Sequence, residues 1–270
     1  MVQKRCGTQK EPVKLLWTGG WDSTFRLLQL SIYKRRITQP FYLIDPKRRS
    51  TKHEIQAMER IKGHLFAEHP GLQGYILPTK YAEVRDIPQN ASITEAHRRV
   101  AGRSFIGEQY DWLSRWCAAN GFRDIELCVH LDDEVHKAIE RYVTRSSEDG
   151  DKGCRLDDNS AATDEFLLFR HFRFPLFDLS KRDMMHAARA HGLDNYMEMT
   201  WFCHNPSYGS SPCGICNPCR YAIEEGLAYR VPFFGRGKYQ MQRFFIRTLK
   251  KRAPLLYLIG RTVARKIGWA

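Results

Sequence analysis

The chain has 270 residues, 43% of them hydrophobic, and a formal net charge of +13. This composition suits one large folded domain, alone or with an appendage, and no apolar run reaches the ~20 residues that a membrane span needs. Eleven Lys or Arg residues and no Asp or Glu lie between Arg230 and the end, which leaves +2 for the rest. The basic character therefore concerns the partners of the C-terminal segment rather than chemistry in the body.

The first elements that the sequence predicts are a buried strand at residues 13–17 and a helix that includes residues 25–30. Gly19 and Gly20 lie in the turn between them, where bare backbone amides can approach a ligand closely. The amides at the start of the helix, together with its positive dipole end, form a cradle for an anion. A Gly-Gly turn is also common for purely structural reasons. The residues expected to hold phosphates are Trp17, Thr18, Gly19, Gly20, Asp22, Ser23 and Thr24.

The order of residues in this turn excludes two common phosphate loops. No lysine follows the glycines as in a Walker A loop, and a Gly-x-Gly-x-x-Gly pattern is absent. The segment Thr18-Gly-Gly-Trp-Asp-Ser23 instead resembles the Ser-Gly-Gly-x-Asp-Ser loop of the ATP pyrophosphatase (PP-loop) family. The resemblance implies an enzyme that splits ATP between the α and β phosphates and activates a carboxylate or carbonyl group as an adenylate.

Strand and helix signals alternate along the middle of the chain. Strands are predicted at 40–45, 74–78 and 124–129, and helices at 51–66, 106–120 and 132–143. This alternation predicts an α/β fold in which helices cover both faces of a parallel sheet and the ligand binds at the carboxyl ends of the strands. Residues 145–162 are polar and rich in Ser, Asp and Gly, so we expect a mobile loop there.

A helix is also predicted from Lys181 to His191. Ser180 and Asp183 form a capping pair at its start, and Gly192 ends it. Lys181 in the first turn could reach a phosphate, although a lysine at this position is also commonly solvated. A PP-loop enzyme that transfers sulfur would need a reactive cysteine. The candidates are Cys117, Cys128 and Cys154, of which the first two have the pattern of core residues.

Four further cysteines are spaced like metal ligands. Two interlocked Cys-x-x-Cys steps bring three thiolates together, and a loop rich in Ser, Pro and Gly lets a fourth fold back. Four thiolates favour Zn²⁺ in a closed structural site. The same cysteines could instead form disulfides or hold an iron–sulfur cluster. Disulfides are disfavoured because the sequence shows no secretory signal and indicates a cytoplasmic protein. The expected metal ligands are Cys203, Cys213, Cys216 and Cys219.

Taken in order, these motifs resemble the 7-cyano-7-deazaguanine synthase family. The series consists of the Thr-Gly-Gly-Trp-Asp-Ser loop, Leu179-Ser-Lys181, Glu198-Met-Thr-Trp-Phe-Cys203 and Cys213-Gly-Ile-Cys-Asn-Pro-Cys-Arg220. The resemblance implies that ATP and Mg²⁺ activate the carboxylate of 7-carboxy-7-deazaguanine as an acyl adenylate. Ammonia then gives the amide, and a second ATP gives the nitrile. It also implies catalytic roles for Asp22, Ser23 and Lys181.

Two segments depart from the family pattern. Residues 130–137 lack the Tyr-Pro-Asp-Cys-Arg that the family has near its substrate, and the basic tail is foreign to it. The acceptor could therefore be an amine on a protein or another macromolecule instead of ammonia. Two further functions are compatible with the sequence: a PP-loop enzyme that modifies tRNA, and a non-catalytic zinc-ribbon adaptor for nucleic acid.

The expected organisation is a synthase-like domain over residues 1–229, with the zinc-binding region at 196–229, and a basic, helical extension over 230–270. The extension could pack on the body with a solvated basic face. As a partner site, it favours a protein over a membrane or nucleic acid. The family resemblance also implies a homodimer.

Overall fold

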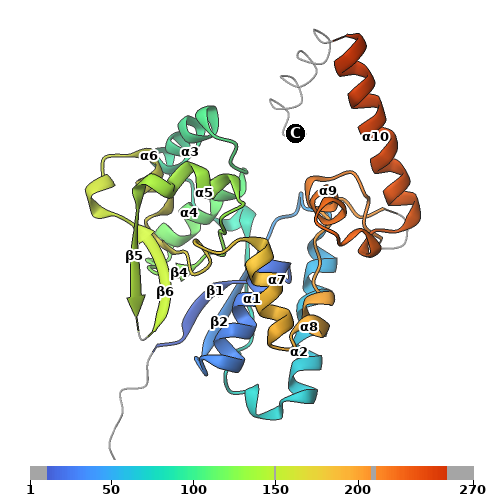
Figure 1. The fold of residues 1–270 in the computed structure, drawn as a ribbon. Helices are drawn as coiled ribbons and strands as arrows, with labels where there is room; N and C mark the ends of the chain where they lie inside the picture. The colour runs from blue at the N-terminus through green and yellow to red at the C-terminus, as the bar shows by residue number, and fades with distance from the viewer. Residues whose placement is uncertain (1–10, 149, 208–210, 254–270) are drawn as a thin grey trace, which may run out of the picture. The chain divides into compact units, whose positions relative to one another are not determined.

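The computed structural model describes residues 11–148, 150–207 and 211–253 (Figure 1). Contacts divide the chain into two compact units. The first unit comprises Met1–Pro46 and Glu54–Thr200, and the second comprises Lys47–His53 and Trp201–Ala270. None of the described helices combines the length and the apolar character that a membrane-spanning helix requires. The expected boundary between a body of residues 1–229 and an extension of residues 230–270 stays a prediction.

The first unit is built on a five-stranded parallel sheet with the strand order β3-β2-β1-β4-β7. The expected α/β fold with a parallel sheet is thereby confirmed. The central strand β1 immediately precedes the Gly-Gly turn. The strands are β1 (Val13–Leu16), β2 (Thr38–Ile44), β3 (Lys80–Glu83), β4 (Ile125–Glu126) and β7 (Phe172–Arg173).

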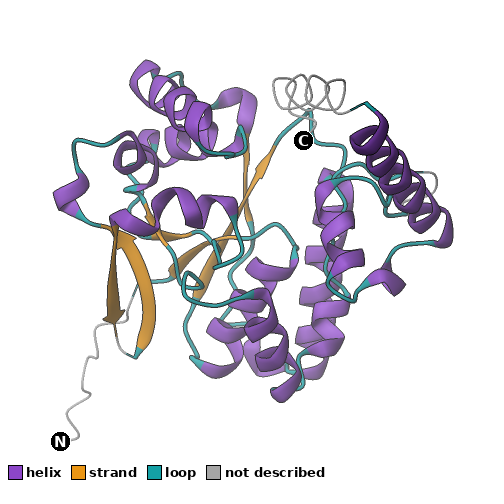
Figure 2. Cartoon of the chain, turned by 45° about the horizontal axis from the view of Figure 1, so that its top comes forward, coloured by secondary structure: helices purple, strands orange, loops and turns teal. Residues whose placement is uncertain are grey.

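Helices cover both faces of this sheet, as the sequence predicts (Figure 2). Successive strand residues point to opposite faces, so Leu16 and Phe41 belong to one core and Leu15 and Tyr42 to the other. The first core includes residues of α3 (Ala91–Arg103), α4 (Gln109–Ala119), α5 (Glu134–Ile139) and α6 (Asp164–Phe169). The second includes residues of α1 (Trp21–Leu28), α2 (Thr51–Glu68), α7 (Lys181–Ala190) and α8 (Asp194–Glu198).

Several predicted boundaries in the middle of the chain are wrong. Residues 74–78 form only an isolated bridge at Ile76, because Pro78 has no N–H to continue the ladder, and β3 follows instead. The sequence reasoning missed α3, which buries only Ile93, Ala96 and Val100 and so has a weak apolar stripe. The predicted strand 124–129 is two residues long. The helix predicted at 132–143 ends at Ile139, where a 3₁₀ turn, Glu140–Tyr142, begins.

Much of the segment expected to be a mobile loop at 145–162 is an antiparallel hairpin. Its strands are β5 (Val143–Glu148) and β6 (Asp151–Leu156). The sequence of this hairpin resembles that of a loop, because many of its residues are polar and stabilise it through ion pairs instead of apolar contacts. Arg145 pairs with Asp178 at 2.7 Å, and Arg155 pairs with Asp124 at 2.5 Å.

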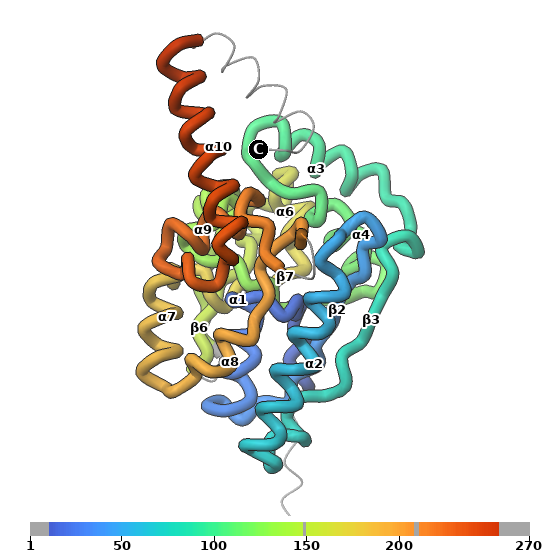
Figure 3. Tube along the Cα trace, turned by 90° about the vertical axis from the view of Figure 1, so that its right-hand side faces the viewer, coloured from blue at the N-terminus to red at the C-terminus, as the bar shows by residue number. Residues whose placement is uncertain are grey.

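The second unit contains the four-cysteine loop, α9 (Asn217–Glu224), a 3₁₀ turn at Ala228–Arg230 and α10 (Phe233–Arg252). Gly214 has a φ of +82°, and a Cβ atom on it would lie 1.9 Å from the Gly235 carbonyl oxygen. The cysteine loop therefore contacts the start of α10 backbone to backbone. Figure 3 shows α10 continuing past the rest of this unit. Helix α10 lies within the helical extension expected over 230–270, whereas residues 254–270 of that extension lie outside the described residues.

Candidate nucleotide site and metal centre

The Gly-Gly turn joins β1 directly to α1, and Gly20 is the N-cap residue of that helix. Gly19 has a φ of +66°, a conformation that costs little only for glycine. A Cβ atom at Gly19 would lie 2.8 Å from the Glu54 carbonyl oxygen and 3.0 Å from Met58 Cγ. Because α2 packs so closely against the turn, this position requires glycine on steric grounds as well.

Hydrogen bonds within the turn divide its residues into two groups. The Trp17 indole N–H donates to Thr24 Oγ1 at 3.0 Å, and both side chains are fully buried. These two residues therefore fix the shape of the turn from inside. The Thr18 backbone N–H donates to Ser23 Oγ at 3.3 Å, and the Gly20 N–H donates to Thr18 Oγ1 at 3.4 Å. Thr18 and Gly20 are half-buried and lie closer to the surface, with Ser23 linked to them.

Asp22 carries an unsatisfied carboxylate oxygen. Within the described part of the chain its buried Oδ1 has no hydrogen-bond partner, while Oδ2 lies 3.8 Å from His130 Nε2. A buried acceptor without a partner is costly, and such atoms often mark places where a ligand or ion binds. A hard cation with oxygen ligands, such as Mg²⁺, fits this carboxylate.

The sequence reasoning did not identify His130 and Asp133 as part of this site. His130 Nδ1 accepts the Asp132 backbone N–H at 3.2 Å, so the ring proton lies on Nε2, which is 3.4 Å from Asp133 Oδ1. Burial, with a further contribution from the Asp22 carboxylate, raises the pKa of Asp133. A signal for this grouping existed, because residues 130–133 closely follow β4, the neighbour of β1, and the carboxyl ends of adjacent parallel strands share one edge.

The start of α7 lies at the same edge. The expected capping box is confirmed: Ser180 Oγ accepts the Asp183 N–H, and the Asp183 carboxylate accepts the Ser180 N–H at 2.9 Å. The Lys181 backbone N–H donates to Asp132 Oδ2 at 2.8 Å. The structure therefore brings Lys181, Asp22 and the His130–Asp133 turn to one edge of the sheet.

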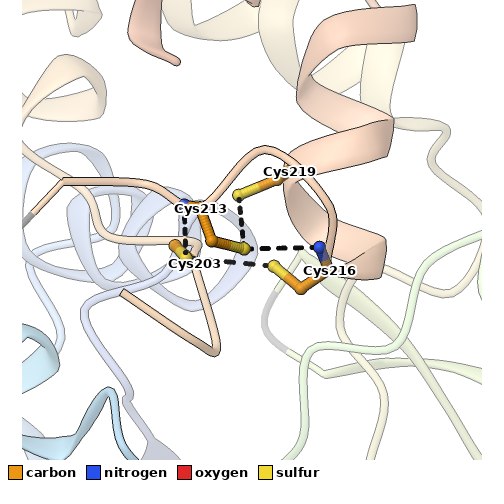
Figure 4. Close-up of side chains that lie close together, drawn as sticks. All are labelled: Cys203, Cys213, Cys216 and Cys219. Carbon is orange, nitrogen blue, oxygen red and sulfur yellow. Dashed lines mark hydrogen bonds between the residues drawn. The ribbon is translucent and has the colours of Figure 1, made fainter. Parts of the chain in front are cut away.

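The four cysteines expected to bind metal lie together in the second unit (Figure 4). Their sulfur atoms all lie within 4.8 Å of one another, and the Cys213–Cys219 and Cys216–Cys203 pairs are 3.9 Å apart. Tetrahedral Zn²⁺ with Zn–S bonds of ~2.3 Å places its sulfurs about 3.8 Å apart. The spacing thus fits a single zinc ion, and it is far too long for disulfide bonds.

Local structure in the second unit prepares these sulfurs for a cation. Cys216 is the N-cap residue of α9, and Cys219 lies in its first turn. The Cys213 N–H donates to Cys203 Sγ at 3.2 Å, and the Cys216 N–H donates to Cys213 Sγ at 3.4 Å. Hydrogen bonding to Cys203 lowers the pKa of Cys213, and it lowers the pKa of Cys216 to about 6. The thiolate forms of these two cysteines are therefore favoured, whereas hydrogen bonds within the cluster raise the pKa of Cys203 and Cys219.

The remaining described cysteines lie outside this cluster. Burial raises the pKa of Cys117 and Cys128, and it raises the pKa of Cys154 to about 11. None of these thiols is a ready nucleophile at neutral pH, because the thiolate is the reactive form. These environments disfavour a sulfur-transfer role for the three cysteines.

The site and the fold together define a class: an α/β protein with a glycine turn suited to phosphate after its first strand and a separate four-cysteine centre. Residues 164–228 match the family model described as queuosine biosynthesis protein QueC. This range includes the capped start of α7 and all four clustered cysteines, and it confirms the resemblance to the 7-cyano-7-deazaguanine synthase family. No curated protein matches the chain.

Proposed function

We propose that this protein uses ATP to activate the carboxylate of a 7-deazapurine as an acyl adenylate and then joins the acyl group to ammonia or another amine. The match over residues 164–228 supports the reaction class. The observation that carries the proposal is the turn at residues 18–24. There, a sterically required glycine and the N-terminus of α1 lie beside an Asp22 carboxylate oxygen that has no hydrogen-bond partner among the described residues.

Each group in the turn has a chemical role in this proposal. The Gly19 and Gly20 amides and the Thr18 and Ser23 hydroxyls hold phosphate oxygens at the positive end of α1. Mg²⁺, when bound, neutralises phosphate charge, and the Asp22 carboxylate would hold it. Lys181 stabilises the charge that develops on the leaving pyrophosphate, since such displacements depend mainly on positioning and electrostatics.

The substrate that we propose first is 7-carboxy-7-deazaguanine, with ammonia as the acceptor. The turn at residues 130–133 stands where the family pattern has its substrate-side motif, but its residues differ, and His130 is almost fully buried between the Asp22 and Asp133 carboxylates. The acceptor is therefore the least constrained part of the proposal. Zn²⁺ at the cysteine cluster has a structural role, because all four ligand positions are filled by protein sulfur.

The test is turnover of labelled ATP with 7-carboxy-7-deazaguanine, ammonium and Mg²⁺, with mass spectrometry of the products. We expect AMP and pyrophosphate together with an amide or nitrile. Asp22→Asn keeps the shape of the side chain but removes its charge, and it should slow AMP formation by roughly 100-fold or more. The matched control is Asp86→Asn, which changes an exposed carboxylate in the same unit and should retain activity.

Two results would contradict the proposal. One is AMP formation that Asp22→Asn leaves unchanged, which would place the nucleotide elsewhere. The other is neither pyrophosphate nor AMP with 7-carboxy-7-deazaguanine or related deazapurine carboxylates, from protein that is folded and loaded with zinc. Pyrophosphate with an adenylate that accumulates despite added ammonium, and without release of AMP, would support the activation step and direct the search to a different amine.

A further inference from the structure

The helix α10 carries an apolar face that the rest of the described chain leaves exposed. Successive residues of an α-helix are about 100° apart, which places this face within an arc of about 120°. Its side chains are 64–81% exposed. We call it the aromatic face, and it consists of Phe233, Phe234, Met241, Phe244 and Phe245.

The opposite side of α10 is the one that packs. Gly235 and Tyr239 are the buried residues of the helix. Gly235 lies against the cysteine loop, and the Tyr239 hydroxyl donates to Glu224 of α9 at 2.6 Å. The helix is therefore attached to the second unit by one side in its first turns, and its aromatic face points the other way.

The charges on α10 have a single sign. The helix has seven Lys or Arg residues and no Asp or Glu. By the same helical spacing, Arg236 and Arg247 lie along one flank of the aromatic face and Lys238 lies along the other. Arg243 donates to the Tyr239 hydroxyl at 3.3 Å, and Lys250 lies on that packing side of the helix. Lys251 and Arg252 follow at its C-terminal end. An apolar face bordered by cations is the pattern of helices that lie in the interface of a membrane.

We propose that α10 docks on an anionic lipid surface, with the aromatic face in the interface and the flanking cations on lipid headgroups. A bilayer surface accepts projecting phenyl rings without a matching pocket and presents negative charge to both flanks at once. Charge argues against two other partners for the aromatic face. A second copy of α10 would bring two sets of seven cations together. The C-terminal residues 254–270 of the same chain contain three more Lys or Arg residues and no Asp or Glu, so they would also be repelled by the cations of α10.

The test is sedimentation of the full-length protein with vesicles. We expect binding to phosphatidylcholine vesicles that contain about a third phosphatidylglycerol to exceed binding to pure phosphatidylcholine by tenfold or more, and to weaken at high salt. The double variant Phe244→Ser/Phe245→Ser should lose at least about tenfold in affinity for the anionic vesicles. Phe105→Ser, which changes a half-exposed phenyl ring in the first unit, is the matched control and should bind like the wild type.

Three results would overturn the proposal. Equal binding to neutral and anionic vesicles would show that the cations of α10 do not contribute to the affinity for lipid. Undiminished binding of the double serine variant would place the lipid-binding surface elsewhere. A dimer that the double variant abolishes, or tight binding to an acidic protein or nucleic acid, with no affinity for vesicles, would assign the aromatic face to that partner. Retained zinc content and an unchanged circular dichroism spectrum verify that each variant is folded.

Discussion

At the scale of single residues, Gly19 gives the clearest prediction. Gly19→Ala forces a side chain into the left-handed region and brings its Cβ to 2.8 Å from the Glu54 carbonyl oxygen. That oxygen belongs to the backbone of α2 and cannot rotate away. We expect the change to lower the free energy of unfolding by about 1–3 kcal/mol and to weaken ATP binding, because the turn must move. Urea unfolding and calorimetric titration with ATP measure the two effects.

The matched control is Gly63→Ala in the interior of α2. A Cβ at Gly63 meets nothing within 4 Å, so alanine should raise the free energy of unfolding by about 0.5–1 kcal/mol through helix propensity and leave ATP binding unchanged. If Gly19→Ala were as stable as the wild type and bound ATP normally, the proposed close packing of the turn against α2 would be wrong.

The same turn shows how far single residues were predictable. The strand, turn and helix at this point could be predicted from local order, because a strand signal, two glycines and an N-terminal helix signal are consecutive in the chain. His130 and Asp133 lie more than 100 residues from Asp22, and only the pairing of β1 with β4 brings them near it. Such contacts depend on strand order, which a single sequence does not specify.

At the scale of elements, one buried ionic network links the hairpin to the sheet. Arg26 of α1 is 1% exposed and donates to Glu126 of β4 at 2.7 and 2.6 Å and to Asp151 of β6. Arg173 of β7 donates to Glu126 at 2.7 Å. A buried pair is costly to break because removing one partner leaves an uncompensated charge. The network therefore holds together one helix, two strands of the sheet and the hairpin.

The pKa of Asp151 predicts how the stabilisation from this network depends on pH. Burial by itself would raise that pKa, but hydrogen bonds from Arg26 outweigh burial and hold it at about 2, below the ordinary 3.8. A depressed carboxyl pKa stabilises the fold above pH 3.8, and the stabilisation is lost as the pH falls toward 2. Asp151→Asn should therefore cost about 2 kcal/mol at pH 7, and the difference from wild type should shrink to about half by pH 3.

Urea unfolding of both proteins at pH 7 and pH 3 measures this difference. Asp178→Asn is the control in the same region, since Asp178 pairs with Arg145 where both side chains are more than half exposed. That exposed pair should be worth about 1 kcal/mol or less. If both variants lost the same free energy of unfolding at pH 7, burial would not make the ion pairs of this network more stabilising than the exposed pair.

This network also explains why some elements could not be predicted. The sequence predicted the strands and helices whose apolar residues recur with the right period, such as β2 and α2. The hairpin has its register set by backbone pairing and ion pairs, so its strands lack the alternation of apolar and polar residues that marks a half-buried strand. Its partners, Arg26 and Asp178, lie far away in sequence and could not be assigned in advance.

At the scale of the whole molecule, the two units differ in what stabilises them. The first has two extensive hydrophobic cores, one on each face of the sheet. The core of the second, in its described part, is the cysteine cluster itself, in which Cys203, Cys213 and Cys219 are buried and Trp201, Phe202 and Cys216 pack against them. The zinc ion proposed for this cluster would therefore supply much of the stability of this unit, because binding of a structural Zn²⁺ contributes on the order of 10 kcal/mol to folding.

Removal of zinc should therefore unfold the second unit and leave the first folded. Treatment with a strong chelator, or the substitution Cys216→Ser, should open the Lys- and Arg-rich segment from Arg220 to Arg252 to trypsin, while the first unit resists cleavage. Mass spectrometry of the fragments and a colorimetric zinc assay measure the two effects.

Cys117→Ala alters a buried cysteine outside the cluster and should keep one zinc per chain. Simultaneous cleavage of both units after chelation would show instead that the sheet depends on the metal, and full protease resistance without zinc would show that the second unit folds by its own packing.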